Sequence, residues 1–142
     1  MQPRTIEIEQ ILAERFGHDT LIALATVSGS TPYVRTVNAL YIDGAFYVLT
    51  HSLSGKMRQL AENPVCALSG EWFTAHGTGV SLGAFSAPEN AVLAQTLRDA
   101  FAGWIDNGHV DLSDPHSIIL QIRLTQGVLY SHGRRFDVDF TR

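Results

Sequence analysis

The chain has 142 residues, close to the commonest size of one domain, so we expect a single domain over residues 1–142. Hydrophobic residues make up 45% and exclude a disordered chain, while charged residues make up only 17%, below the roughly 25% usual in soluble domains. With so few charges, part of the surface is expected to be covered by a partner subunit. The net charge of −4 argues against a nucleic acid or an anionic membrane as partner.

The cysteine and histidine residues set limits on metal and redox chemistry. The single cysteine, Cys66, excludes an internal disulfide and a metal site built from cysteines. No two of the six histidines stand at a metal-ligand spacing, so no metal site is expected. No apolar segment has the length of a membrane span, and the first residues lack a signal-peptide core, so we expect a cytoplasmic protein.

The first third of the chain predicts a helix followed by three strands. Ile8, Leu12 and Phe16 recur at helical spacing, and Gly17 stands where such a helix would end. The β-favouring segments are residues 20–27, 33–42 and 45–51. Asp43-Gly44 separates the last two and is the pair preferred in a two-residue type I′ turn, so these segments should form a hairpin.

The remaining sequence predicts helices alternating with short strands. Ser54 can cap a helix that Asn63-Pro64 ends. Residues 86–89 have the spacing of a capping box, before an apolar stripe that reaches Trp104. The further strands are expected at residues 65–69, 117–125, 128–130 and 136–140, with residues 70–83 as an irregular strand or loop. Short strands joined by tight turns predict a mostly antiparallel sheet that closes into a small barrel, an α+β fold.

The hairpin brings polar residues onto one face. If Asp43-Gly44 is the turn, Val37 lies opposite Thr50 and Arg35 lies opposite Ser52, and all four side chains share a face. The helix that Ser54 would cap begins immediately beyond, with Gly55 and Lys56 in its first turn.

This arrangement has the chemistry of an anion site. A guanidinium, an ammonium, several hydroxyls and the free N–H groups of a helix start suit a phosphate or a carboxylate. An edge arginine and a solvated lysine with no ligand are the alternative interpretation.

Residues 21–70 also resemble the pyridoxamine 5′-phosphate oxidase-like flavoproteins. The shared pattern is a strand carrying Arg35, an Asp-Gly turn, a strand ending in Thr50, and Ser54-x-Lys56 at the start of a helix that ends Asn-Pro. The resemblance implies a split β-barrel of about six mostly antiparallel strands with flanking helices, of the FMN-binding type. It also implies a homodimer with the flavin at the subunit interface.

Several site residues follow from this resemblance. It implies that Arg35, Ser54 and Lys56 hold the FMN phosphate, with Gly55 where many members have an arginine. It places the backbone of Thr36, Val37 and Asn38 along the isoalloxazine ring, and Leu49 and Thr50 beside the cofactor. It also places Trp72 and His76 near the flavin of the other subunit, with packing in the core of the interface as the alternative for Trp72. The chain ends DVDFTR, without the Arg-Leu-x-Pro-type signature of the oxidases proper. Oxidation of pyridoxamine phosphate is therefore not expected.

The leading functional hypothesis is an oxidoreductase in which FMN takes hydride from a reduced nicotinamide donor and passes electrons to a small acceptor. Because the flavin performs the redox chemistry, no catalytic residue needs to be visible, and none is identified. The alternatives are a non-catalytic flavin-binding or electron-transfer protein, and a split barrel that binds a deazaflavin or haem instead. Haem would need His76 or His132 as an axial ligand. A purely structural role is a further alternative.

Overall fold

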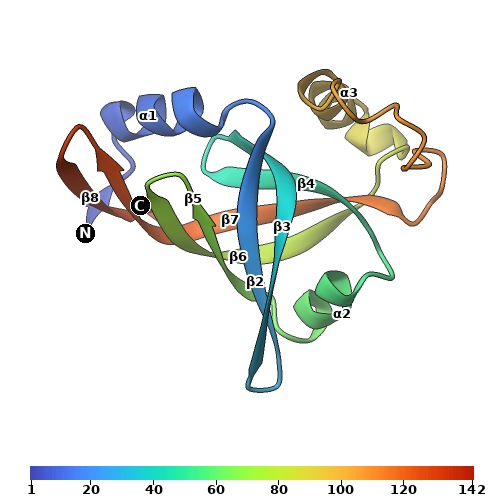
Figure 1. The fold of residues 1–142 in the computed structure, drawn as a ribbon, viewed down its shortest axis with the longest axis horizontal. Helices are drawn as coiled ribbons and strands as arrows, with labels where there is room; N and C mark the ends of the chain where they lie inside the picture. The colour runs from blue at the N-terminus through green and yellow to red at the C-terminus, as the bar shows by residue number, and fades with distance from the viewer.

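Six antiparallel strands close into a barrel in the computed structural model, which describes all 142 residues (Figure 1). The elements are β1 (Gln2–Pro3), α1 (Ile6–Phe16), β2 (Thr20–Ser28), β3 (Thr31–Ile42), β4 (Ala45–His51), α2 (Gly55–Glu62), β5 (Val65–Gly70), β6 (Phe73–Ala84), a 3-10 turn (Pro88–Asn90), α3 (Ala91–Ala100), β7 (Ser117–Ser131) and β8 (Arg134–Asp139). Around the barrel the order is β7–β4–β3–β2–β5–β6, and β6 pairs with β7 to close it. β8 continues the sheet beyond β7, and β1 pairs with β8 in parallel. The predicted α+β split barrel is confirmed.

The barrel is split between β3 and β4. The Asp43-Gly44 turn forms with the predicted register, since Ile42 pairs with Ala45. The pairing stops after Leu40–Tyr47, so the predicted pairs Val37–Thr50 and Arg35–Ser52 do not form. That prediction is wrong because the two strands separate beyond this pair: β4 continues along β7 as far as His51, while β3 continues along β2 as far as Thr31, and their facing edges stay unpaired.

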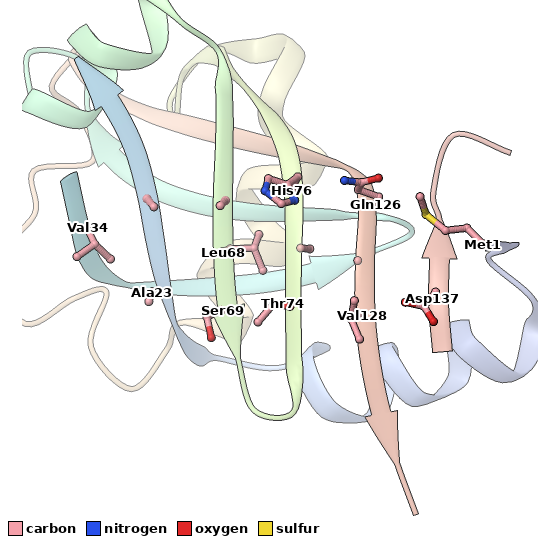
Figure 2. A pocket seen from close by; sticks show the side chains of 14 residues that line it. Met1, Ala23, Val34, Leu68, Ser69, Thr74, His76, Gln126, Val128 and Asp137 are labelled. Carbon is pink, nitrogen blue, oxygen red and sulfur yellow. The ribbon is translucent and has the colours of Figure 1, made fainter. Parts of the chain in front are cut away.

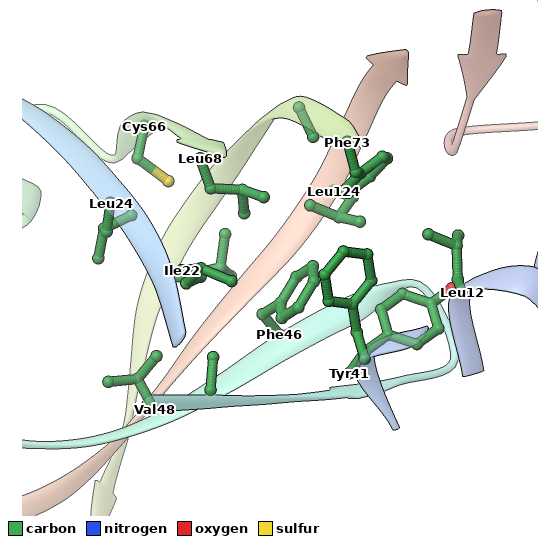
Figure 3. Packing of buried hydrophobic residues seen from close by; sticks show 14 of the residues in the cluster. Leu12, Ile22, Leu24, Tyr41, Phe46, Val48, Cys66, Leu68, Phe73 and Leu124 are labelled. Carbon is green, nitrogen blue, oxygen red and sulfur yellow. The ribbon is translucent and has the colours of Figure 1, made fainter. Parts of the chain in front are cut away.

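Alternate residues of each strand face the two sides of the barrel wall. On β2, Ala23 and Ala25 face outward and line a shallow groove (Figure 2). Ile22 and Leu24 face the interior, where both are at most 1% exposed (Figure 3). The ring of Phe46 lies at the centre of the interior and meets other aromatic rings at centroid distances of 5.4–6.5 Å. The centre of the core is thus built from aromatic rings, and each ring buries a large apolar surface.

Helices α1 and α2 cover opposite ends of this interior, as Figure 1 shows. The buried face of α1 places Phe16 against Phe73, at a ring-centroid distance of 5.7 Å. At the other end Leu60 of α2 packs so closely on Gly79 of β6 that a Cβ there would lie 2.9 Å from it. α3 lies outside the barrel and covers a second apolar cluster. None of the three helices is both long and apolar enough to cross a membrane.

Three elements differ from the predicted ones. Residues 86–89 form no capping box: α3 begins at Ala91, because buried Asn90 donates Nδ2 to the carbonyls of Leu82 and Ala84 and holds the preceding turn. Trp104 therefore lies beyond the helix, although its ring packs 5.0 Å from that of Phe101. The glycine-rich residues 73–84 form a strand with two register shifts, and residues 117–131 form one continuous strand. In both cases pairing between β6 and β7 overrides the local glycine signal.

Candidate functional site

Arg35 reaches from β3 to α2 across the open end of the barrel. Its Nη1 donates to the Thr26 hydroxyl at 2.7 Å and to the Leu24 carbonyl at 3.2 Å, and its Nη2 donates to Gln59 Oε1 at 3.2 Å. Thr26 and Gln59 also hydrogen-bond each other. All of these acceptors are neutral, so they orient the guanidinium and leave its charge uncompensated.

Lys56 lies beside this guanidinium in the first turn of α2. Its Nζ donates to the Thr50 hydroxyl at 2.9 Å, at the end of β4. Burial lowers the pKa of Lys56 below its ordinary value of 10.5, and the positive charge of Arg35 lowers it further. Burial also lowers the pKa of Arg35. Because neither residue takes part in any of the six ion pairs, the two cations form a positive site with no acidic partner.

The start of α2 leaves hydrogen-bonding capacity unused. Ser54 precedes the helix as predicted, but the predicted cap does not form, because its hydroxyl accepts from no backbone N–H. Its Oγ is buried and has no hydrogen-bond partner, which is unusual for a polar atom inside a protein. At Gly55 an added Cβ would meet nothing within 4 Å, so space lies open over the first turn. An unused hydroxyl, open space and a helix start fit a group bearing several oxygens.

The split supplies an open strand edge next to these cations. Between Thr31 and Ala39, β3 pairs with β2 on one side and with no strand on the other. Peptide groups around Thr36, Val37 and Asn38 on that free edge are therefore available to a flat ligand. The side chains have structural roles, because Val37 packs against the core and Asn38 Nδ2 donates to Asp19 at 3.0 Å.

Three predicted residues lie apart from this cluster. Leu49 packs into the second apolar cluster under α3, and the Ser52 hydroxyl is 2.7 Å from His116 Nδ1. Trp72 is 69% exposed at the tip between β5 and β6, at the end of the barrel opposite α2. A contact between Trp72 and the flavin of another subunit stays a prediction.

His76 lies in the groove on the outer face of the barrel. Figure 2 shows it near the middle of the groove, with Met1 and Asp137 at one end. The groove has a volume of about 440 Å³, and small or apolar side chains of β2, β5, β6 and β7 form most of its lining. The sequence analysis missed this face, although alanines at alternate positions of β2 were its signal. It also missed Thr26 and Gln59, which no local pattern connects with Arg35.

Comparison with known proteins supports the fold. No protein-family model matches the sequence, and no curated protein matches it. Among solved structures, a protein related to general stress protein 26, of the pyridoxinephosphate oxidase family, from Clostridium acetobutylicum has a TM-score of 0.63. The two chains are 18% identical over 96% of this chain and 94% of that one. The chain has the pyridoxamine 5′-phosphate oxidase-like fold.

Other structures with this split-barrel fold are described by their ligands. A FAD-binding protein from Mesorhizobium loti has a TM-score of 0.63 at 16% identity, over 83% of this chain and 90% of that chain. A haem-binding protein from Mycobacterium smegmatis has a TM-score of 0.64 at 18% identity, over 87% of this chain and 53% of that chain. At such identities the pyridoxamine 5′-phosphate oxidase-like fold is what the three proteins share with this chain, and function must be argued from its residues.

The proximity of the two cations makes a prediction about the pKa of Lys56. Arg35→Gln should raise that pKa toward 10.5, because it removes the neighbouring positive charge. Lys56 is the only lysine of the chain, so the ζ-nitrogen of ¹⁵N-lysine-labelled protein gives one NMR titration curve. Arg58→Gln, on the same helix, is the matched control and should leave the curve in place. Equal shifts in the two variants would show that Arg35 is not the neighbour that matters.

Proposed function

We propose that the protein is an FMN-binding flavoprotein and an oxidoreductase that passes electrons from a reduced nicotinamide donor to a small acceptor. The observation that carries the proposal is the uncompensated pair Arg35 and Lys56 beside the open edge of β3. A phosphate monoester carries about two negative charges at pH 7, which matches two cations. The FAD-binding protein of the same fold supports a flavin as the ligand.

Each residue of the site would have a separate task. Arg35, Lys56 and Ser54 would hold the phosphate, while Thr50 keeps the ammonium in place. Thr26 and Gln59 accept hydrogen bonds from the Arg35 guanidinium and so fix its orientation. The free peptide groups of residues 36–38 would bind the polar edge of the flat ring. Bound FMN supplies the hydride and electron transfer chemistry, so the protein has to bind, orient and shield it.

The same proposal includes a homodimer. Leu21, Val34 and Val65 are 56–69% exposed on the strands that border the groove with His76. Such an apolar face on a chain with few charges is typical of a surface that another subunit covers. A second copy placed there would bring His76 toward the flavin of the neighbouring subunit.

Haem, bound in the groove around His76, is the second candidate for the ligand of this protein. His76 is an imidazole within an apolar groove of about 440 Å³, which is a suitable setting for an axial ligand. The haem-binding protein from Mycobacterium smegmatis supports this candidate in the same way as the FAD-binding protein supports the first.

Cofactor binding is the direct test. After incubation with FMN and desalting, the protein should retain about one flavin per chain, and Arg35→Ala or Lys56→Ala should weaken binding about 10–100-fold, since each removes charge-assisted hydrogen bonds. Affinity should fall as the pH rises through the lowered pKa of Lys56, because only the ammonium form attracts phosphate. Absorption spectroscopy and fluorescence titration measure both effects.

The control for FMN binding is an arginine outside the proposed site. Arg123 is exposed and belongs to no ion pair, so Arg123→Ala should bind FMN like the unmodified protein. Retention of a haem Soret band that Arg35→Ala leaves unchanged and His76→Ala abolishes would favour the second candidate.

The oxidoreductase role is tested on the FMN-loaded protein. Oxidation of NADH or NADPH in the presence of a quinone or a nitroaromatic acceptor should run faster than with the same concentration of free FMN. Rates equal to those of free FMN with every pair of donor and acceptor would refute the oxidoreductase role and favour a non-catalytic flavin-binding protein.

The dimer is tested with two exposed valines. Val34→Glu, which places a charge in the groove, should give monomers in analytical ultracentrifugation and weaken FMN retention. Val92→Glu is the control, because Val92 is 84% exposed on α3 and away from the groove. Dimers of unchanged stability in Val34→Glu would place the subunit contact elsewhere.

A further inference from the structure

Two hairpin turns meet at the end of the barrel opposite α2 and form an aromatic corner. One joins β5 to β6 and carries Trp72, and the other joins β7 to β8 and follows Tyr130. The Tyr130 backbone N–H donates to the Trp72 carbonyl at 3.0 Å. The two rings lie edge to face, with centroids 6.4 Å apart and an angle of 66° between them. This corner is formed by one chain and lies apart from Arg35 and Lys56.

The backbone at Trp72 is in the left-handed region, with φ of 52°. Glycine or asparagine is the usual residue for such a turn, and a bulky side chain adopts this conformation rarely. Trp72 nevertheless stands there with 69% of its surface exposed. The turn itself does not need an indole, so the exposed ring is free to contact a ligand.

Arg15 of α1 supplies a charge at this corner. Its Nη1 lies 3.2, 3.4 and 3.0 Å from the carbonyl oxygens of Glu71, Trp72 and Tyr130, and so ties α1 to both turns. Its Nε and Nη2 donate to no group, and Arg15 belongs to none of the six ion pairs. The Arg15 guanidinium is therefore held in position by Nη1, while the N–H groups of Nε and Nη2 remain available to a ligand.

These groups border one cavity of about 270 Å³. Its lining consists of Arg15, Trp72, Tyr130, Ser131, His132 and Gly133. This volume has room for one aromatic ring or for two fused rings. The single guanidinium, that of Arg15, can pair with one negative charge. We propose that this cavity binds a small planar aromatic carboxylate, with the ring against Trp72 and Tyr130 and the carboxylate on Arg15. The cavity shares no residue with the Arg35 and Lys56 site, but Trp72 is also the residue predicted to reach the flavin of another subunit, and the last experiment below separates the two roles.

Trp72 itself can report binding. The chain has two tryptophans, so in the variant Trp104→Phe all indole emission comes from Trp72. Benzoate added to this full-length variant should quench the emission saturably. Benzamide lacks the charge and cyclohexanecarboxylate lacks the aromatic ring, and each should bind at least 10-fold more weakly than benzoate. Equal affinity for benzamide, or no saturable quenching by benzoate, would overturn the proposal.

Variants of the protein separate binding from folding. Arg15→Lys keeps the charge but loses the planar fork, and should weaken benzoate binding about 10-fold. Trp72→Asn puts a turn-favouring residue at φ 52°, so it should melt no lower than the unmodified protein and yet lose benzoate in saturation-transfer NMR. Arg58→Lys, on α2, is the control and should bind normally. Undiminished benzoate binding by Trp72→Asn would overturn the proposal, even if Arg15→Lys fails to fold.

Flavin must be examined in the same experiment. Titration of Trp104→Phe with FMN should leave the Trp72 emission open to quenching by benzoate. If FMN quenches this emission and benzoate then has no effect, Trp72 belongs to a flavin site of the dimer and the carboxylate site is refuted.

Discussion

The separation of β3 from β4 is the constraint on which the rest of this structure depends. A strand needs hydrogen-bond partners along its edges, and β4 finds them on β7 along its entire length. β3 meets β4 only next to the Asp43-Gly44 turn and otherwise has β2 alone. The barrel closes through β6 and β7, and the facing edges of β3 and β4 stay unpaired where the two strands separate. α2 lies at that opening and brings Lys56 close to Arg35.

Two partly buried cations lie side by side at the opening. Arg4, Arg98, Arg134 and Arg135 each have a carboxylate partner, whereas Arg35 and Lys56 have only neutral acceptors. Burial disfavours the charged form of both side chains, and Arg35 lowers the pKa of Lys56 further, which is unfavourable in the free protein. An anion that binds between them reverses this effect. The arrangement is thus better explained by a ligand than by stability.

The two ends of the barrel have different chemistry because different helices cover them. α2 contributes a helix start, a lysine and an open glycine position, which together suit a phosphate. α1 contributes Arg15, which holds two turns with left-handed residues and exposes an aromatic corner. The barrel wall between them carries small outward side chains where another surface can pack closely. Under the two proposals, the site of Arg35 and Lys56 and the cavity beside Arg15 bind different ligands at opposite ends of one barrel.

The sequence by itself determined much of the local structure and the residues of the proposed anion site. Alternating apolar residues, the Asp43-Gly44 turn and the Asn63-Pro64 helix end predict most elements, because these signals act over a few residues. Arg35 and Thr50 were grouped from a hairpin register that does not continue beyond Leu40–Tyr47. In the structure α2 brings these residues together instead, because Arg35 reaches Gln59 and Lys56 reaches Thr50. Only the tertiary structure decided which strand edges stay unpaired. It also decided that Thr26 and Gln59 orient Arg35, and that the Ser52 hydroxyl hydrogen-bonds His116. Those contacts join segments that are distant in the chain, and they depend on how the barrel closes, which no local pattern specifies.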